Sequence, residues 1–259
     1  METVSRVAIV GSFVVVAMLL RYLFIAVSTW WVCYRWRRTQ LAQSKIQPAW
    51  PKTTDEAREV KYSLLTMVIF GLVAVSVFNP WVRPYTQLMA APLDYGWGYL
   101  LLSFLATLVV HDTYFYWMHR LVHHKKLFRH VHKVHHLSTN PTPLAALAFH
   151  PYEALFEAGI IYVLVFTFPL HGYTIAAFLF FMFAYNVYGH MGWEIVPKRV
   201  RNGWVGKWFN TSTHHNAHHQ YFHGNYGLYF LWWDRWMGTL RQEQKPAKPA
   251  TVKADKALV

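Results

Sequence analysis

The sequence of 259 residues contains a single cysteine, Cys33, and this scarcity excludes several kinds of site. One cysteine cannot form an internal disulfide or a thiolate cluster, so the chain alone builds neither a disulfide scaffold nor an iron–sulfur centre. The sequence also contains no GxGxxG fingerprint of a flavin site and no HExxH motif of a hydrolytic zinc site. Any metal that the chain binds must therefore rest on nitrogen and oxygen ligands.

Acidic residues are scarce as well, with 12 Asp and Glu against 25 Lys and Arg, which gives a formal net charge of +13. A strong positive charge is typical of nucleic-acid-binding proteins, but here the basic residues lie beside long hydrophobic runs. Anionic lipid headgroups explain basic residues in that position. No nucleic-acid partner is therefore expected.

Apolar residues, in contrast, make up 54% of the chain and gather in runs too long for a soluble core. Five runs are apparent, and the turn Pro169–Gly172 between the last two is short enough to predict a helical hairpin. The expected membrane spans are residues 7–32, 61–78, 96–117, 152–168 and 172–188. The predicted fold is all-α: a polytopic membrane protein of about five transmembrane helices (four to five) with a histidine-rich helical cap.

Basic residues alternate between the two sides of these spans. Segments 33–61, 116–150 and 191–259 carry seven, five and ten Lys or Arg, whereas residues 79–94 carry only Arg83. By the positive-inside rule, the three basic segments face the cytoplasm. The sequence therefore predicts an integral, multi-pass membrane protein whose histidine clusters lie on the cytoplasmic side.

Histidine is the second abundant feature, because the stretch HRLVHHKKLFRHVHKVHH at 119–136 holds seven of the 16 histidines. This stretch contains one HxxxH and one HxxHH spacing, and a second HxxHH begins at His215. Residues three and four apart share a helix face, so each motif can present two or three imidazoles to a common point. Eight imidazoles are too many for one ion, and two metals that share them are the simplest interpretation.

A pH sensor, or a merely solvated surface, is the alternative interpretation of so many histidines, because imidazole gains charge at about pH 6.5. A sensor needs no repeated helical spacing, however, so metal binding is favoured. Imidazole suits zinc, copper, nickel and iron, and the motifs alone do not identify the ion.

The ordered set HxxxH, HxxHH and HxxHH behind hydrophobic spans resembles the integral-membrane fatty acid hydroxylase and sterol desaturase superfamily. The resemblance covers residues 98–240 and extends to flanking stretches. These are HDTYFYWMHR at 111–120, AFHPYE at 148–153, GHMGWE at 189–194 and NYGLYFLWWDRWMGT at 225–239. The resemblance implies a dinuclear iron centre that uses dioxygen to hydroxylate or desaturate a lipid.

Carried over motif by motif, the resemblance implies nine metal ligands. They are His119, His123, His132, His135, His136, His190, His215, His218 and His219. His190 matches an additional histidine of the family at the end of the last span, whereas Asn186 stands where some relatives have another. Asn186 is therefore either a weaker ligand or the sign of a more open metal site.

Further residues near the motifs are expected to orient the ligands or to add to them. Asp112 precedes His119 on the same span and is expected to accept a proton from a ligand imidazole, or else to pair with a basic residue. His150 and His214 are expected either beside the ligands or as additional ligands. His150 and Glu153 also fit a simple helix start, with a carboxylate near the positive end of the helix dipole.

The expected function is that of a membrane-bound oxidoreductase that hydroxylates or desaturates a sterol, a fatty acyl chain or a related lipid with dioxygen. Its expected cofactor is two iron ions, which zinc can replace during expression. Because no haem-binding domain, flavin fingerprint or cysteine cluster accompanies the motifs, the expected partner is a separate electron donor, a ferredoxin or a b-type cytochrome with its reductase.

The alternative function is a non-catalytic membrane metal protein, a zinc carrier or sensor. The spans carry almost no ionisable residue apart from Arg21, which argues against transport. The favoured interpretation divides the chain into an N-terminal transmembrane region at 1–95, a fatty acid hydroxylase-like catalytic domain at 96–240 and a disordered basic tail at 241–259.

Overall fold

The computed structural model describes residues 2–89 and 95–241, so nearly all of the expected tail lies outside the described residues. Over these two ranges the chain is helical, and extended segments pair only in three isolated bridges. The predicted all-α fold is therefore confirmed.

Four helical segments are long and apolar enough to cross a membrane, in agreement with the expected four to five, and the chain is an integral membrane protein. The first, Ile9–Trp36, is a rod that joins α1 (Glu2–Arg21) and α2 (Ser28–Trp30) through π-helical turns. The other three are α4 (Thr53–Phe78), α5 (Gly96–Val122) and α9 (Gly172–His190). Helix α4 ends before Asn79 and Pro80, because the residue before a proline disfavours helical geometry.

Helix α8 (Pro151–Thr167) occupies the fourth expected span but is shorter than these four segments. Its 17 residues extend about 26 Å at the usual helical rise, less than the roughly 30 Å of a bilayer core. Pro151 starts the helix, and the ring of His150 accepts a hydrogen bond from the N–H of Tyr152 at 3.3 Å. The helix start therefore explains why these two residues precede the apolar run.

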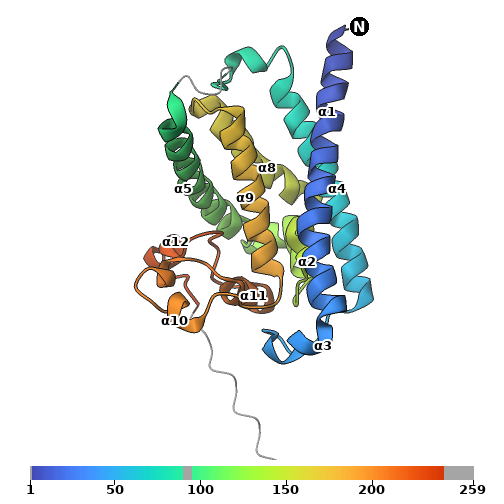
Figure 1. Cartoon of the computed structure of the whole chain (residues 1–259), viewed down its shortest axis with the longest axis vertical. Helices are drawn as coiled ribbons and strands as arrows, with labels where there is room; N and C mark the ends of the chain where they lie inside the picture. Colours follow the sequence, from blue (N-terminus) through green and yellow to red (C-terminus); the bar gives the residue numbers. More distant parts are fainter. Residues whose placement is uncertain (1, 90–94, 242–259) are drawn as a thin grey trace, which may run out of the picture.

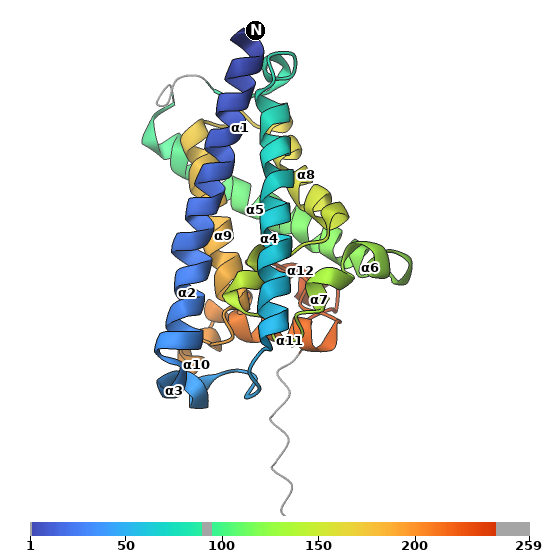
Figure 2. The same ribbon diagram turned by 90° about the vertical axis from the view of Figure 1, so that its right-hand side faces the viewer.

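Figures 1 and 2 show the rod of α1 and α2 lying along α4, while α5, α8 and α9 complete the bundle. The short helices α3 (Arg38–Leu41), α10 (Lys198–Arg201) and α11 (Ser212–Tyr221) lie at the end opposite the N-terminus (Figure 1). Helix α7 (Lys133–His136) lies beside α11 at this end (Figure 2). The histidine motifs therefore gather at one end of the bundle.

A buried segment, Pro143–Leu147, packs between the membrane helices just above the histidine motifs. All five residues of this segment are buried, and the Leu144 carbonyl accepts hydrogen bonds from the hydroxyls of Tyr22 and Ser63 at 3.0 and 2.9 Å. These bonds satisfy a backbone group that has no access to water. The segment thereby fixes the position of Leu147 and Phe149 within the core of the bundle.

Candidate metal centre

Nine histidine rings from separate parts of the chain converge where the membrane helices meet the cap. They come from the end of α5, from α7 and the residue before it, from the last residue of α9, and from α11. Eight of the nine are at most 4% exposed, and the ninth, His123, is partly buried. The nine are the same histidines that the sequence implies as ligands: His119, His123, His132, His135, His136, His190, His215, His218 and His219.

The rings form two adjacent groups, within each of which the candidate ligand nitrogens all lie within 4.8 Å of one another. The first histidine group consists of His119, His123, His132, His136 and His218. The second histidine group consists of His135, His190, His215 and His219. The rings of His136 and His219 stack across the boundary between the groups, with their centroids 4.8 Å apart.

Each HxxHH motif contributes to both groups. His132 and His136, four residues apart, serve the first group, while His135 points into the second. The second motif is divided in the opposite sense: His215 and His219 belong to the second group, and His218 belongs to the first. Neighbouring positions on a helix differ by about 100° in direction, so adjacent histidines cannot face the same ion.

The Nε2 atoms face one another inside each group. In the first group, His119 and His132 bring these nitrogens to 3.1 Å, and His123 and His136 also to 3.1 Å. In the second group, the Nε2 of His190 lies 3.1 Å from that of His215. Such short contacts between ring nitrogens need either a shared proton or a cation between them.

The opposite ring nitrogen decides between these two possibilities. Five rings place Nδ1 against an oxygen. Four of these oxygens are backbone carbonyls, in the pairs His119–Tyr226 (2.9 Å), His190–Asn186 (2.8 Å), His218–Gly224 (2.7 Å) and His219–Ser138 (3.0 Å). The fifth is the carboxylate Oε1 of Glu153, 2.6 Å from Nδ1 of His132. Because a carbonyl only accepts, the proton of a neutral ring is on Nδ1 and the Nε2 lone pair points into the group. This donor set fits metal ions that bind imidazole.

Burial keeps the imidazole rings of the second histidine group neutral. Burial, and then the charge of neighbouring imidazoles, hold the pKa of His135, His215 and His219 well below the usual histidine range. Neutral rings have a free lone pair at physiological pH, which a metal ion requires.

Two buried carboxylates shape the loop that orients the first group. Asp112 accepts hydrogen bonds at Oδ1 from the backbone N–H groups of residues 228–230, at 2.7–3.2 Å. Asp234 accepts from the N–H groups of residues 226 and 227 at 3.0 and 2.9 Å. The loop in turn supplies the Tyr226 and Gly224 carbonyls that orient two rings. Asp112 thus contacts no imidazole of either group and instead positions the backbone behind one.

The carboxylate that does contact a candidate ligand is Glu153, which the sequence suggested only as part of a helix start. Its Oε1 lies 2.6 Å from Nδ1 of His132, and both side chains are at most 2% exposed. The signal available in the sequence was an acidic residue at the edge of an apolar span with no basic residue near it. Only the tertiary fold shows that its partner is an imidazole 21 residues away.

Three other expected neighbours of the centre lie outside both groups. The His150 ring caps α8, and the His214 ring contacts the hydroxyl of Thr211 at 3.0 Å. Asn186 contributes through its backbone carbonyl, which accepts from His190, while its side-chain amide donates to a carbonyl of the buried segment at 2.7 Å. Asn186 therefore orients a ring, and its side chain lies in neither group.

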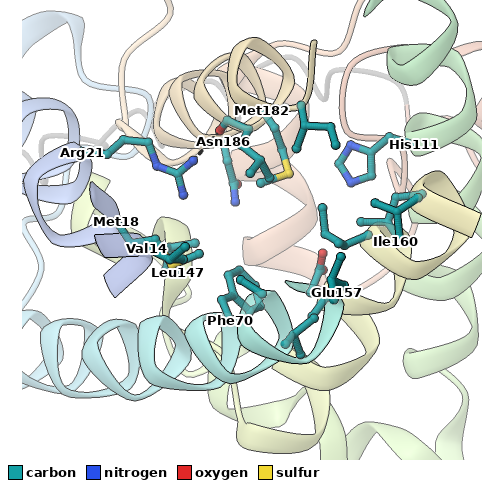
Figure 3. A pocket seen from close by; sticks show the side chains of 18 of the residues that line it. Val14, Met18, Arg21, Phe70, His111, Leu147, Glu157, Ile160, Met182 and Asn186 are labelled. Carbon is teal, nitrogen blue, oxygen red and sulfur yellow. Dashed lines mark hydrogen bonds between the residues drawn. The ribbon is translucent and has the colours of Figure 1, made fainter. Parts of the chain in front are cut away.

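An apolar cavity with about 150 Å³ of free volume lies inside the bundle (Figure 3). Its wall includes Phe115, whose ring centroid is 5.0 Å from that of His119, and Phe149, 5.1 Å from His135. The lining is almost entirely aliphatic and aromatic. Its four polar side chains are Arg21, His111, Glu157 and Asn186, which Figure 3 shows around the cavity.

Comparisons with known proteins agree with this arrangement. The model of the family described as fatty acid hydroxylase matches residues 104–239, more than half of the chain and the whole histidine centre. A Delta(7)-sterol 5(6)-desaturase of Gibberella zeae is 31% identical over 192 residues, which cover 74% of this chain and 58% of the relative. A lathosterol oxidase of Rattus norvegicus is 33% identical over 187 residues, 71% of this chain and 61% of the relative.

A methylsterol monooxygenase of Danio rerio is 29% identical over 210 residues, covering 78% of this chain and 68% of the relative. The chain thus spans about three fifths of the length of the desaturase and the oxidase that it matches. No solved structure is significantly similar to the chain.

Proposed function

Since the chain belongs to the fatty acid hydroxylase family, we propose that it is a membrane-bound oxygenase that hydroxylates or desaturates a lipid with dioxygen. The observation that carries this proposal is the closeness of two buried imidazole groups to an apolar cavity among the membrane helices, with Phe115 and Phe149 packed between them. A zinc carrier would instead need a polar path through the spans. The sterol names of the relatives favour a sterol or a similarly bulky lipid as the substrate.

The proposed cofactor is a pair of iron ions, one in each histidine group. The first group would supply five imidazoles and the second four, with no thiolate and no carboxylate among them. Bound iron supplies the one-electron chemistry with dioxygen that attack on an unactivated C–H bond requires and that no side chain provides. Zinc bound to the purified protein would not argue against this cofactor, because it competes for the same ligands.

The residues of the chain position the reactants. Glu153 and the carbonyls of the loop 224–230 hold the imidazoles in one tautomer and orientation. Phe115 and Phe149 line the cavity and pack against His119 and His135, so a lipid segment in the cavity would lie about one aromatic side chain away from both groups. The apolar lining would hold the target carbon by shape, which leaves the choice between hydroxylation and desaturation to its distance from the centre.

The end of the bundle that carries the histidines is proposed to face the cytoplasm, because the basic segments flank the spans on that side. Electrons would come from a separate ferredoxin or b-type cytochrome with its reductase. The exposed residues Lys125, Lys126 and Arg129 on helix α6 (Lys125–Val131) form a basic edge next to the first histidine group that would attract an acidic carrier.

The test combines metal content with oxygen-dependent chemistry. Iron is counted in the detergent-purified protein, and lipids of cells with and without the chain are compared by mass spectrometry under isotopically labelled dioxygen. We expect about two iron ions per chain and a lipid that has gained one labelled oxygen or lost two hydrogens. His218→Ala and His215→Ala remove one ligand from each group and are expected to abolish the product.

The matched control is His130→Ala, because His130 is exposed and lies in neither group. Less than one metal ion per chain, unchanged in the His218 and His215 variants, would contradict the dinuclear centre. Tightly bound zinc with no oxygen-dependent product would favour the carrier or sensor instead.

A further inference from the structure

One ionisable group in the cavity has no role in holding the metal centre. Glu157 lines the apolar cavity from α8, and Figure 3 shows its carboxyl group pointing into the space, across from Asn186. Glu157 is half-buried, and among the described residues it makes neither a hydrogen bond nor an ion pair, although it shares the cavity wall with apolar residues such as Phe70 and Ile160. No role was expected for Glu157 from the sequence, since Arg21 was the one ionisable residue singled out within the spans.

A carboxyl group without a partner in an apolar membrane cavity is costly, because burial removes its hydrogen bonds to water. Acidic residues inside membrane helices are rare and mark a site of function. A ligand that brings a hydrogen-bond donor into the cavity would remove this cost. We propose that Glu157 binds the hydroxyl group of a lipid alcohol, so that this side chain selects alcohols among the apolar molecules that fit the cavity.

A second charged side chain of the cavity, that of Arg21, limits the charge of this ligand. The Arg21 guanidinium lines the same cavity, and it donates to the Leu179 carbonyl at 2.6 Å and lies 4.8 Å from the centroid of the Phe183 ring. Because Arg21 and Glu157 have opposite formal charges, the cavity offers no net charge to offset the cost of burying a lipid ammonium or a lipid carboxylate. A neutral hydroxyl is compatible with both groups and donates the hydrogen bond that Glu157 lacks.

The position of Glu157 on α8 places the bound hydroxyl near the proposed reaction site. Glu153, which contacts His132, lies four residues earlier and therefore on the same helix face, about 6 Å away along the axis. The ligand's polar end would then lie about one helical turn from the carboxylate that orients the first histidine group. This inference rests on the proposed function for the identity of the reaction, but the binding step itself requires no turnover.

The test measures binding rather than catalysis. The full-length protein is reconstituted in nanodiscs, and equilibrium binding is measured for lathosterol and its methyl ether, and for hexadecanol and its methyl ether. The ether retains the apolar body and loses only the hydrogen-bond donor. We expect at least one alcohol to bind about tenfold more tightly than its ether, the value of one hydrogen bond to a charged or polar buried partner.

Glu157→Leu is expected to reduce this preference to less than about twofold, and Glu157→Gln, whose amide oxygen still accepts, is expected to retain part of it. The control is Leu155→Ala on the same helix, because Leu155 is 55% exposed and does not line the cavity. Unchanged metal content in the Glu157 variants shows that the fold is intact. Equal binding of every alcohol and its ether to the unmodified protein would overturn the proposal.

A preference that survives in Glu157→Leu and disappears in Arg21→Met would also overturn it, since the hydroxyl would then bind at the arginine. The outcome is separable from that of the proposed function. Selective alcohol binding without iron or an oxygen-dependent product would refute the oxygenase and leave the hydroxyl site standing. An oxygen-dependent product with no preference for alcohols over their ethers would support the oxygenase and refute the hydroxyl site.

Discussion

Replacing Glu153 by alanine tests whether the centre depends on a carboxylate that is not itself in either group. In the structure its Oε1 lies 2.6 Å from Nδ1 of His132, and side-chain exposure is 1% for Glu153 and 2% for His132. The variant removes the carboxylate that accepts from this buried N–H. The imidazole then loses both its fixed tautomer and part of its basicity.

The size of the effect follows from these contacts. A buried donor left unsatisfied costs about 1–3 kcal/mol, which corresponds to roughly 5- to 150-fold weaker metal binding. Losing the hydrogen-bond partner of a metal-bound histidine typically costs about 10–100-fold in metal affinity, which agrees. Glu153→Gln keeps an acceptor but loses the charge, and because a charge-assisted bond is about twice as strong as a neutral one, its loss is expected to be several-fold smaller.

The assay loads each protein with iron, dialyses it against increasing concentrations of a chelator, and counts the iron that remains. Only the first histidine group contains His132, so Glu153→Ala is expected to lose one ion at a chelator concentration where the unmodified chain keeps both. Leu155→Ala on the exposed face of α8 is the control. Retention of both ions at the unmodified affinity would refute the reasoning, as would loss of both ions together with a large fall in melting temperature, which indicates a general folding role.

Three further changes test other parts of the structure. Asp112→Asn weakens the hydrogen bonds to residues 228–230 and is expected to lower the melting temperature in detergent by about 5 °C, so an unchanged value would contradict the role of the loop. Gly189→Ala places a methyl group 3.2 Å from the His215 ring, so iron of the second group is expected to dissociate first in the same chelator assay, and equal loss from both groups would argue against this packing. Burial lowers the pKa of Lys45 to about 8, so between about pH 8 and pH 10 the folded chain has released a proton that the unfolded chain keeps. The melting temperature of the unmodified chain is therefore expected to rise over this range relative to that of Lys45→Met. Parallel curves of melting temperature against pH for the two proteins would contradict this.

Most of the fold could be predicted from the helical spacing and the long apolar runs of the sequence. The runs predicted the membrane helices to within a few residues at most ends, although α4 begins at Thr53, eight residues before the expected span at Lys61. Its polar first turns contain Asp55 and Glu56, so the helix continues beyond the hydrophobic stretch that the prediction relied on. Hydropathy reports the part of a helix that lies in lipid, not the whole helix.

The arrangement of the candidate centre could be predicted only in part from the sequence. The motifs identified the nine rings that converge, but the division of each HxxHH between two groups depends on how α7 and α11 are rotated relative to each other. The role of Glu153 and that of Asp112 depend on contacts across 21 and more than 100 residues, which no local pattern encodes. The cavity likewise combines Arg21 and Glu157 from helices far apart in the chain.

The sharing of α7 and α11 between the two histidine groups has a thermodynamic consequence. An ion in one group fixes the rotation of both helices, and the same rotation aims the remaining histidines of each motif at the other group. The first ion therefore lowers the conformational entropy that the second must overcome, and the coupling is reciprocal. Iron in either group is therefore expected to raise the affinity of the other group for its own ion.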